Sequence, residues 1–182
     1  MRTEAMKAAF PGYTIVEELA MQSYSEVYVV QSANGKVRAG KSFEDSEESR
    51  TLFSTESFAL YDLQGIPGIP KLYRSVLKPE VRPHIIMQYV KGDTLDYILN
   101  HENITTENVI ALGKRLCATY LYALKKNIYH DDVSPSNVII PSTFDEAVII
   151  DWALAKREIS RPTELSDKRV VAGTPAYLSP EK

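Results

Sequence analysis

The chain of 182 residues lacks the features that mark secreted and membrane proteins. Its one cysteine, Cys117, cannot form an internal disulfide, and because it lies in an apolar helical pattern we expect it to be buried. No run of about 18 apolar residues exists to cross a bilayer, and residues 1–4 carry no apolar signal-peptide region. We therefore expect a protein of the cytoplasm, with the nucleus as the open alternative, and no membrane partner.

An excess of positive charge is also missing. Lys and Arg total 21 against 24 for Asp and Glu, which gives a net charge of -3. Proteins that hold nucleic acid present a basic field, so we expect no nucleic-acid partner. In contrast, 44% of the residues are hydrophobic, which is enough for a proper core in one domain or two small lobes.

The first half of the chain alternates strand-like segments with turn signals. Strands are expected over residues 13–16, 26–30, 36–39, 71–76 and 84–89. Asn34-Gly35 is a two-residue hairpin signal, because both residue types tolerate positive φ. Between the third and fourth strands the spacing becomes helical over residues 47–63, and Glu56 falls on the apolar face of this helix. The pattern predicts an antiparallel sheet of five strands with one helix.

The second half is mainly helical. A short helix is expected near residues 94–99, and a long amphipathic helix over 106–126 with Thr105 or Thr106 as its cap. A β-like segment follows at 138–140, and the boundary between the two lobes is expected within residues 88–92.

Residues 130–137 read His-Asp-Asp-Val-Ser-Pro-Ser-Asn, and the apolar run 148–150 is followed by Asp151. Phosphoryl transfer needs one carboxylate that orients the attacking hydroxyl and further oxygen ligands that hold Mg²⁺. Asp132, Asn137 and Asp151 have the residue types for these three roles.

This pattern resembles the catalytic loop and the metal-binding Asp-Phe-Gly element of eukaryotic protein kinases. Residues 171–182 are similar to the end of the kinase activation segment, with Gly-Thr-x-x-Tyr-x-x-Pro-Glu intact, and Thr174 is in the serine/threonine-kinase style. The resemblance implies an α+β, bilobal kinase-like fold. A five-stranded N-lobe would occupy residues 13–90 after an N-terminal extension (1–12), and a truncated, mainly helical C-lobe residues 91–182.

The resemblance also implies ATP and Mg²⁺ as cofactors and assigns the site residues. Asp132 would be the catalytic base, Asn137 and Asp151 would bind the metal, and Lys41 would contact the phosphates while paired with Glu56; Glu47 and Glu48 are weaker candidates for that pairing. The nucleotide would be bound by Leu19, Val27, Ala39, Lys41, Met87, Gln88, Tyr89, Val90 and Ile139. A stack of apolar residues would include Leu60, His130 and Trp152.

Several positions depart from the family pattern. The phosphate-covering loop has Ala20, Gln22 and Ser25 in place of its three glycines, since no glycine lies between positions 12 and 35, and we expect weaker nucleotide binding. Ser134 replaces a Lys, Trp152-Ala153 replaces Phe-Gly, and Ser179 replaces an Ala.

Asp131 stands where most members carry an Arg that pairs with a phosphate. An Asp would repel that phosphate, so phosphorylation between residues 156 and 174 should not activate the protein through this contact.

Three functions are therefore compared. The first is an ATP- and Mg²⁺-dependent kinase that phosphorylates Ser or Thr of a protein substrate. The second is a pseudokinase that serves as a nucleotide-binding scaffold or as a decoy inhibitor of a partner kinase. The third is a small-molecule kinase, which the ending of the chain argues against. The long helix around Leu116, Tyr120, Leu121 and Leu124 is expected to lack cover, so self-association or docking on a partner kinase is a further expectation.

Overall fold

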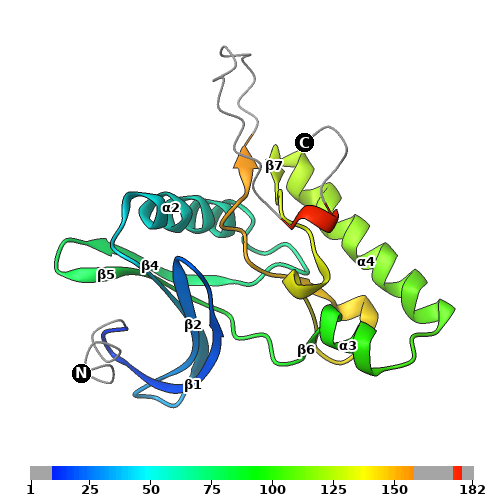
Figure 1. Cartoon of the computed structure of the whole chain (residues 1–182), viewed down its shortest axis with the longest axis horizontal. Coiled ribbons are helices and arrows are strands. Elements are labelled where there is room, and N and C mark those ends of the chain that lie inside the picture. The colour runs from blue at the N-terminus through cyan, green and yellow to red at the C-terminus, as the bar shows by residue number, and fades with distance from the viewer. Residues whose placement is uncertain (1–9, 158–173, 178–182) are drawn as a thin grey trace, which may run out of the picture. The chain divides into compact units, whose positions relative to one another are not determined.

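The computed structural model describes residues 10–157 and 174–177, which belong to two compact units. The first unit takes the chain up to Gln64 and then Pro70–Val90, and the second takes Gly65–Ile69 and the residues from Lys91 onward. In Figure 1 the first unit contains the long strands and α2, and the second contains α3 and α4. Each unit has a hydrophobic core of its own.

The first unit is built on a five-stranded sheet in which every neighbouring pair is antiparallel. Its strands, in the order β1-β2-β3-β5-β4, are β1 (Tyr13–Met21), β2 (Ser25–Ser32), β3 (Val37–Phe43), β4 (Leu72–Lys78) and β5 (Val81–Met87). A hairpin connects β2 and β3 as predicted, but its loop takes the four residues 33–36 rather than two, and of Asn34 and Gly35 only Gly35 has a positive φ, +80°. The five predicted strands are confirmed. Most are longer than predicted, because backbone pairing continues past the residues with high strand propensity.

Among the described residues of this unit one helix occurs, α2 (Glu47–Asp62), which begins at Ser46, whose side chain accepts a hydrogen bond from the Ser49 amide. Phe53, Glu56 and Leu60 lie on its buried face, at the spacing of successive helical turns. The helix packs against β3, β4 and β5. This packing fixes which residue of α2 faces the sheet.

Phe10, from the segment expected to precede the sheet, is part of its core. Its ring is 1% exposed and makes edge contacts with Tyr28 and His84 at 6.0 and 5.6 Å between ring centres. Gly40 provides the space, since a Cβ there would lie 2.8 Å from the Phe10 ring. Phe10 therefore covers part of one face of the sheet.

The second unit contains α3 (Leu95–His101), α4 (Thr106–Lys125) and a small sheet in the order β6-β8-β9. Leu95 and Ile98 of α3 pack on Val138 and Ile140 of β8. Thr105 is the cap of α4 and forms a capping box with Asn108. The short elements are β6 (Asp93–Thr94), β7 (Ile128–Tyr129), η1 (Pro135–Asn137), β8 (Val138–Ile140), η2 (Phe144–Glu146), β9 (Val148–Ile149), β10 (Lys156–Arg157) and η3 (Pro175–Tyr177).

The prediction that Cys117 is buried is wrong, because its residue is exposed on α4. The residues of α4 that are fully buried, Thr119 and Ala123, form a narrow stripe along the helix. Cys117 lies two residues before Thr119, which places it on the other side of a helix with 3.6 residues per turn. An apolar pattern identifies a face of a helix but not whether another element covers it.

The apolar residues of α4 behave in two ways. Leu121 and Leu124 are exposed, as expected for an uncovered face, whereas Leu116 and Tyr120 are half-buried. Among the described residues, no helix combines the length and the apolar character that a membrane span requires.

Candidate functional site

Lys41 and Glu56 form a buried ion pair within the first unit. Lys41 Nζ lies 2.7 Å from Glu56 Oε2, and the two side chains are 3% and 1% exposed. Lys41 is carried by β3 and Glu56 by the buried face of α2. Glu47 and Glu48 are exposed in the first turn of the helix, where acidic side chains interact favourably with the helix dipole. The geometry therefore selects Glu56, as the sequence predicted.

The predicted phosphate-covering loop corresponds to the turn between β1 and β2, which is closed by its own hydrogen bonds. The Gln22 amide donates to the Ser25 carbonyl at 2.9 Å, and the Ser25 hydroxyl donates to Gln22 Oε1 at 2.7 Å. Ser25 is buried, so its side chain fills space that a glycine would leave open. The Gln22 N–H is thus already paired within the turn. A phosphate cradle needs such N–H groups to point outward.

The other predicted nucleotide-binding residues of this unit lie on β1, β2, β3, β5 and the chain leaving β5. Val27 pairs with Lys41 in the β2–β3 register, and Ala39 pairs with Met87 in the β3–β5 register. The Gln88 amide donates to the Lys71 carbonyl at 2.8 Å, and Leu19 is exposed. Tyr89 and Val90 are half-buried. Ile139 belongs to the second unit, so its part in holding an adenine ring stays a prediction.

Asp132 is held by an amide side chain from the turn that follows it. Asn137 Nδ2 donates to the Asp132 carboxylate at 3.1 Å and to the Asp132 carbonyl at 2.9 Å. Because both donations use the nitrogen of the amide, the Asn137 oxygen is left to accept or to bind a cation. The 3-10 turn η1 ends at Asn137, directly before β8, whose first residue, Val138, pairs with Ile149 of β9.

Thr174 reaches the same carboxylate from 42 residues further along the chain. Its backbone N–H and its hydroxyl both donate to Asp132 Oδ1, each at 2.7 Å. The short distances are typical of hydrogen bonds to an ionised acceptor. Gly173, Ser179 and the final Pro-Glu pair of the predicted activation-segment ending lie outside the described residues.

Asp151 follows β9 in a left-handed conformation, with φ of 60°. The adjacent Ile150 amide donates to the Asn137 carbonyl at 2.9 Å, which ties the two predicted metal ligands together through the backbone. Among the described residues, no three His, Cys, Asp or Glu side chains converge on a metal position. Two hard oxygen donors still fit Mg²⁺, which usually takes one or two protein ligands beside substrate phosphates and water.

His130 and Trp152 pack edge to face beneath this loop, with 4.6 Å between ring centres. The Asp132 amide donates to His130 Nδ1 at 3.3 Å, so the ring proton belongs on Nε2, which contacts the Ile150 carbonyl at 2.9 Å. Burial lowers the pKa of His130, against the opposing effects of the Ile150 carbonyl and of Asp151, Asp132 and Asp131. A neutral imidazole therefore supports the backbone of the loop.

Comparison with known proteins identifies the family. A model of the protein kinase domain matches residues 13–182. The chain belongs to the protein kinase family. This result confirms the resemblance found in the sequence and the α+β kinase fold, with its five-stranded antiparallel N-lobe sheet.

The relatives of this kinase-family chain include proteins from animals and bacteria. It is 32% identical to serine/threonine-protein kinase DCLK3 of Mus musculus over 119 residues, which cover 63% of this chain and 14% of that protein. It is 26% identical to serine/threonine-protein kinase PknD of Chlamydia pneumoniae over 201 residues, or 93% and 21% of the two chains. A third relative is serine/threonine-protein kinase PknB of Mycobacterium leprae, which is 32% identical over 101 residues. These residues cover 55% of this chain and 16% of that protein. The chain thus spans about a fifth or less of these relatives.

Two departures from the kinase pattern have a structural explanation. The Trp152 indole is fully buried, and its Nε1 donates to the Ile149 carbonyl at 3.2 Å, so the larger ring fits without an unpaired donor. Ser134 is also buried, and its hydroxyl shares a hydrogen bond of 2.8 Å with Ser136. No Lys or Arg occurs within residues 130–137. This segment therefore has no cation of its own.

Leu60, the third predicted member of the apolar stack, is buried in the core of the first unit. Its place in a stack with His130 and Trp152 stays a prediction.

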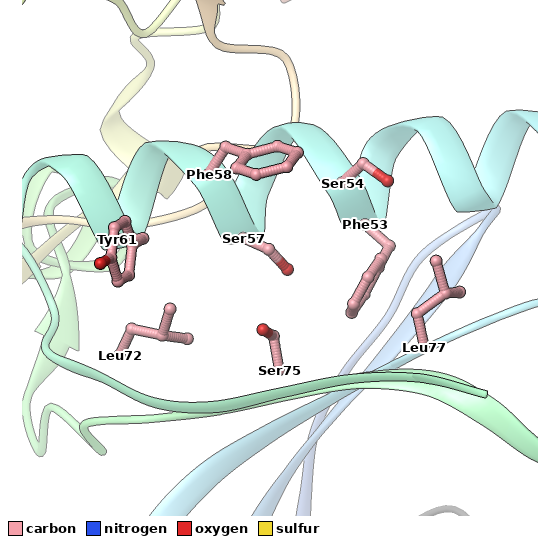
Figure 2. A pocket seen from close by; sticks show the side chains of 8 residues that line it. All are labelled: Phe53, Ser54, Ser57, Phe58, Tyr61, Leu72, Ser75 and Leu77. Atoms are coloured by element: carbon pink, nitrogen blue, oxygen red, sulfur yellow. The ribbon is translucent and has the colours of Figure 1, made fainter.

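Sequence reasoning missed a groove on the first unit, between α2 and β4. Figure 2 shows Ser57 of the helix and Ser75 of the strand pointing toward one another across it. The cavity measures about 380 Å³, and the Ser57 hydroxyl has no hydrogen-bond partner among the described residues. Its lining consists of Phe53, Ser54, Ser57, Phe58, Tyr61, Leu72, Ser75 and Leu77. The helical spacing of the aromatic residues signals burial, and nothing in the sequence separates a groove from a closed core.

Proposed function

We propose that the chain is a protein kinase that transfers the γ-phosphate of ATP to Ser or Thr hydroxyls of proteins. The observation that carries the proposal is the Asp132 carboxylate, which is held by Asn137 on one oxygen and by Thr174 on the other. A carboxylate oriented from two sides is suited to bind a hydroxyl and accept its proton. The relatives named above are all serine/threonine-protein kinases, which supports the same substrate class.

The residues of each unit have their own part in the proposed reaction. Asp132 orients the attacking hydroxyl, and the Lys41 ammonium, held by Glu56, binds phosphate oxygens. Asn137 and Asp151 supply oxygen ligands for Mg²⁺, and the bound metal would neutralise charge on the phosphates. Thr174 keeps the Asp132 carboxylate from rotating, which lowers the entropy lost when a hydroxyl binds.

A scaffold or decoy pseudokinase is the second candidate, and two observations favour it. The Gln22 amide is paired within its own turn, and the catalytic loop has no Lys or Arg. Both features weaken the binding and stabilisation of phosphate charge. A pseudokinase of this kind would bind a partner kinase rather than phosphorylate a substrate.

Transfer of labelled γ-phosphate from ATP to a generic protein substrate and to the chain itself tests the proposal. Transfer that requires Mg²⁺ and is lost in Asp132→Asn and in Asp151→Asn is expected. Asp145→Asn, an exposed carboxylate of η2, provides the matched control and should retain the wild-type rate. Calorimetric binding of ATP without transfer would favour the pseudokinase. Transfer that is unaffected by Asp132→Asn would contradict the role assigned to Asp132, and it would also contradict the pseudokinase.

A further inference from the structure

Asp131, the residue before the proposed catalytic base, has an unusual backbone and a nearly buried side chain. Its φ is 68°, a left-handed value that costs a non-glycine residue free energy and persists only where the surroundings impose it. The side chain is 12% exposed, and Lys156 Nζ lies 2.5 Å from Asp131 Oδ2. Lys156 itself is 65% exposed, so the pair joins a surface cation to an enclosed carboxylate.

Lys156 is also one of the two residues of β10, which pairs with β7 next to the catalytic loop. The register places Lys156 opposite Tyr129 and Arg157 opposite Ile128, in an antiparallel ladder. A ladder of two residues on each strand is too short to be stable alone. Because Asp131 follows β7 by two residues, the ion pair and the ladder connect the same two segments and reinforce one another.

The charges around this loop explain why a cation is needed there. Asp131, Asp132 and Asp151 all act electrostatically on the His130 ring, so three carboxylates lie around one buried side chain. Residues 130–137 contain no Lys or Arg to offset them. Lys156 brings a positive charge from β10 to the first of these carboxylates. Loss of this charge would leave more of the repulsion among the three groups uncompensated.

We propose that the Asp131–Lys156 pair is an internal latch, and that Lys156 is a positioning residue for Asp132. The positioning role of Lys156 rests on the proposed kinase function, whereas the latch itself does not. The pair attaches the chain after Asp151 to the loop before Asp132 by a contact that is complete without phosphorylation. In the family pattern an Arg at position 131 would pair with an added phosphate. In this chain the charge at position 131 is negative instead of positive. A phosphate near Lys156 would therefore compete with Asp131 for the Lys156 ammonium and loosen the latch.

Hydrogen exchange of the full chain measures the latch without requiring activity. In Lys156→Met and in Asp131→Asn, the amides that close the β7–β10 ladder should exchange about three- to tenfold faster, as expected for a partly exposed pair. The double variant should exchange no faster than either single variant, because the same interaction is lost in all three. Lys156→Arg should restore protection. Lys126→Met, which removes an exposed cation beyond the C-terminus of α4, is the control and should leave the ladder unchanged.

Phosphotransfer kinetics then test the positioning role. Lys156→Met should lower kcat with little change in KM for ATP, Lys156→Arg should recover kcat, and phosphatase treatment of the wild type should not reduce it. Exchange rates that stay at the wild-type value in both single variants would overturn the latch, whatever the activity. Faster exchange in a chain that transfers no phosphate would leave the latch standing and reject the proposed function instead. An unchanged kcat in Lys156→Met would reject the positioning role.

Discussion

At the scale of single residues, the Lys41–Glu56 pair has the largest predicted effect on stability. Both charges are almost completely removed from water, so removing one partner leaves the other buried and uncompensated. Glu56→Gln should lower the free energy of unfolding by about 3–5 kcal/mol in urea denaturation. Glu47→Gln, on the exposed first turn of the same helix, should change it by less than about 0.5 kcal/mol. Equal losses in the two variants would show that the pair is not buried as described.

A second residue-scale prediction concerns His84, whose ring packs against Phe10 in the core of the sheet. Burial lowers the pKa of His84, while its hydrogen bond to the Arg82 carbonyl opposes this effect and the positive charge of Arg74 adds to it. The unfolded chain therefore takes up a proton near pH 6.5, before the folded chain does. Stability should be fully present above pH 6.5 and should fall as the pH drops below that value.

Thermal unfolding between pH 7.5 and 5.5 measures this dependence. In His84→Gln the loss of stability on acidification should be smaller than in the wild type, with a remainder due to His130, whose pKa is also lowered by burial. His101→Gln, in which an exposed ring stacked on Tyr97 is removed, should keep the wild-type dependence. Identical curves for wild type and His84→Gln would contradict the prediction.

At the scale of elements, the β1–β2 turn determines how well the first unit can hold phosphate. The Gln22–Ser25 hydrogen bonds close this turn on itself. Restoring the family glycines in Ala20→Gly/Gln22→Gly/Ser25→Gly should raise the affinity for Mg·ATP by about tenfold, the equivalent of one additional hydrogen bond to a charged group. Ser23→Gly adds flexibility at a position where the family pattern has no glycine, and calorimetry should show no gain for it. Equal affinities for wild type and the triple variant would reject this role of the turn.

Some elements could be predicted from the sequence because their signals are local. Asn34-Gly35 marks the position of its hairpin, although not the length of the loop, and the spacing of α2 places Glu56 toward the sheet, where Lys41 lies. The β7–β10 ladder and the Lys156–Asp131 contact could not be predicted, because they join residues 25 to 29 positions apart that have no periodic pattern. Cys117 was predicted incorrectly for a related reason, since burial on α4 depends on what covers the helix.

At the scale of the whole molecule, the chain consists of two units, and each carries part of the proposed site. Lys41 and Glu56 belong to the first, and Asp132, Asn137, Asp151 and Thr174 to the second. The sequence motifs could be assigned to these units because each motif is contiguous or nearly so. The position of Phe10 in the core could not be predicted, because a lone aromatic residue before the first strand does not indicate the face on which it packs.

The most direct test of the account is the rate of γ-phosphate transfer at saturating Mg·ATP by the wild-type chain and by Asp132→Asn. The account predicts measurable transfer by the wild type and a loss of about 10²-fold or more in the variant, the usual contribution of a general base. Asp145→Asn should match the wild type, since that carboxylate lies on the exposed turn η2. Equal rates for wild type and Asp132→Asn, or binding of ATP with no transfer by either, would contradict the assignment of Asp132 as the catalytic base of a working kinase.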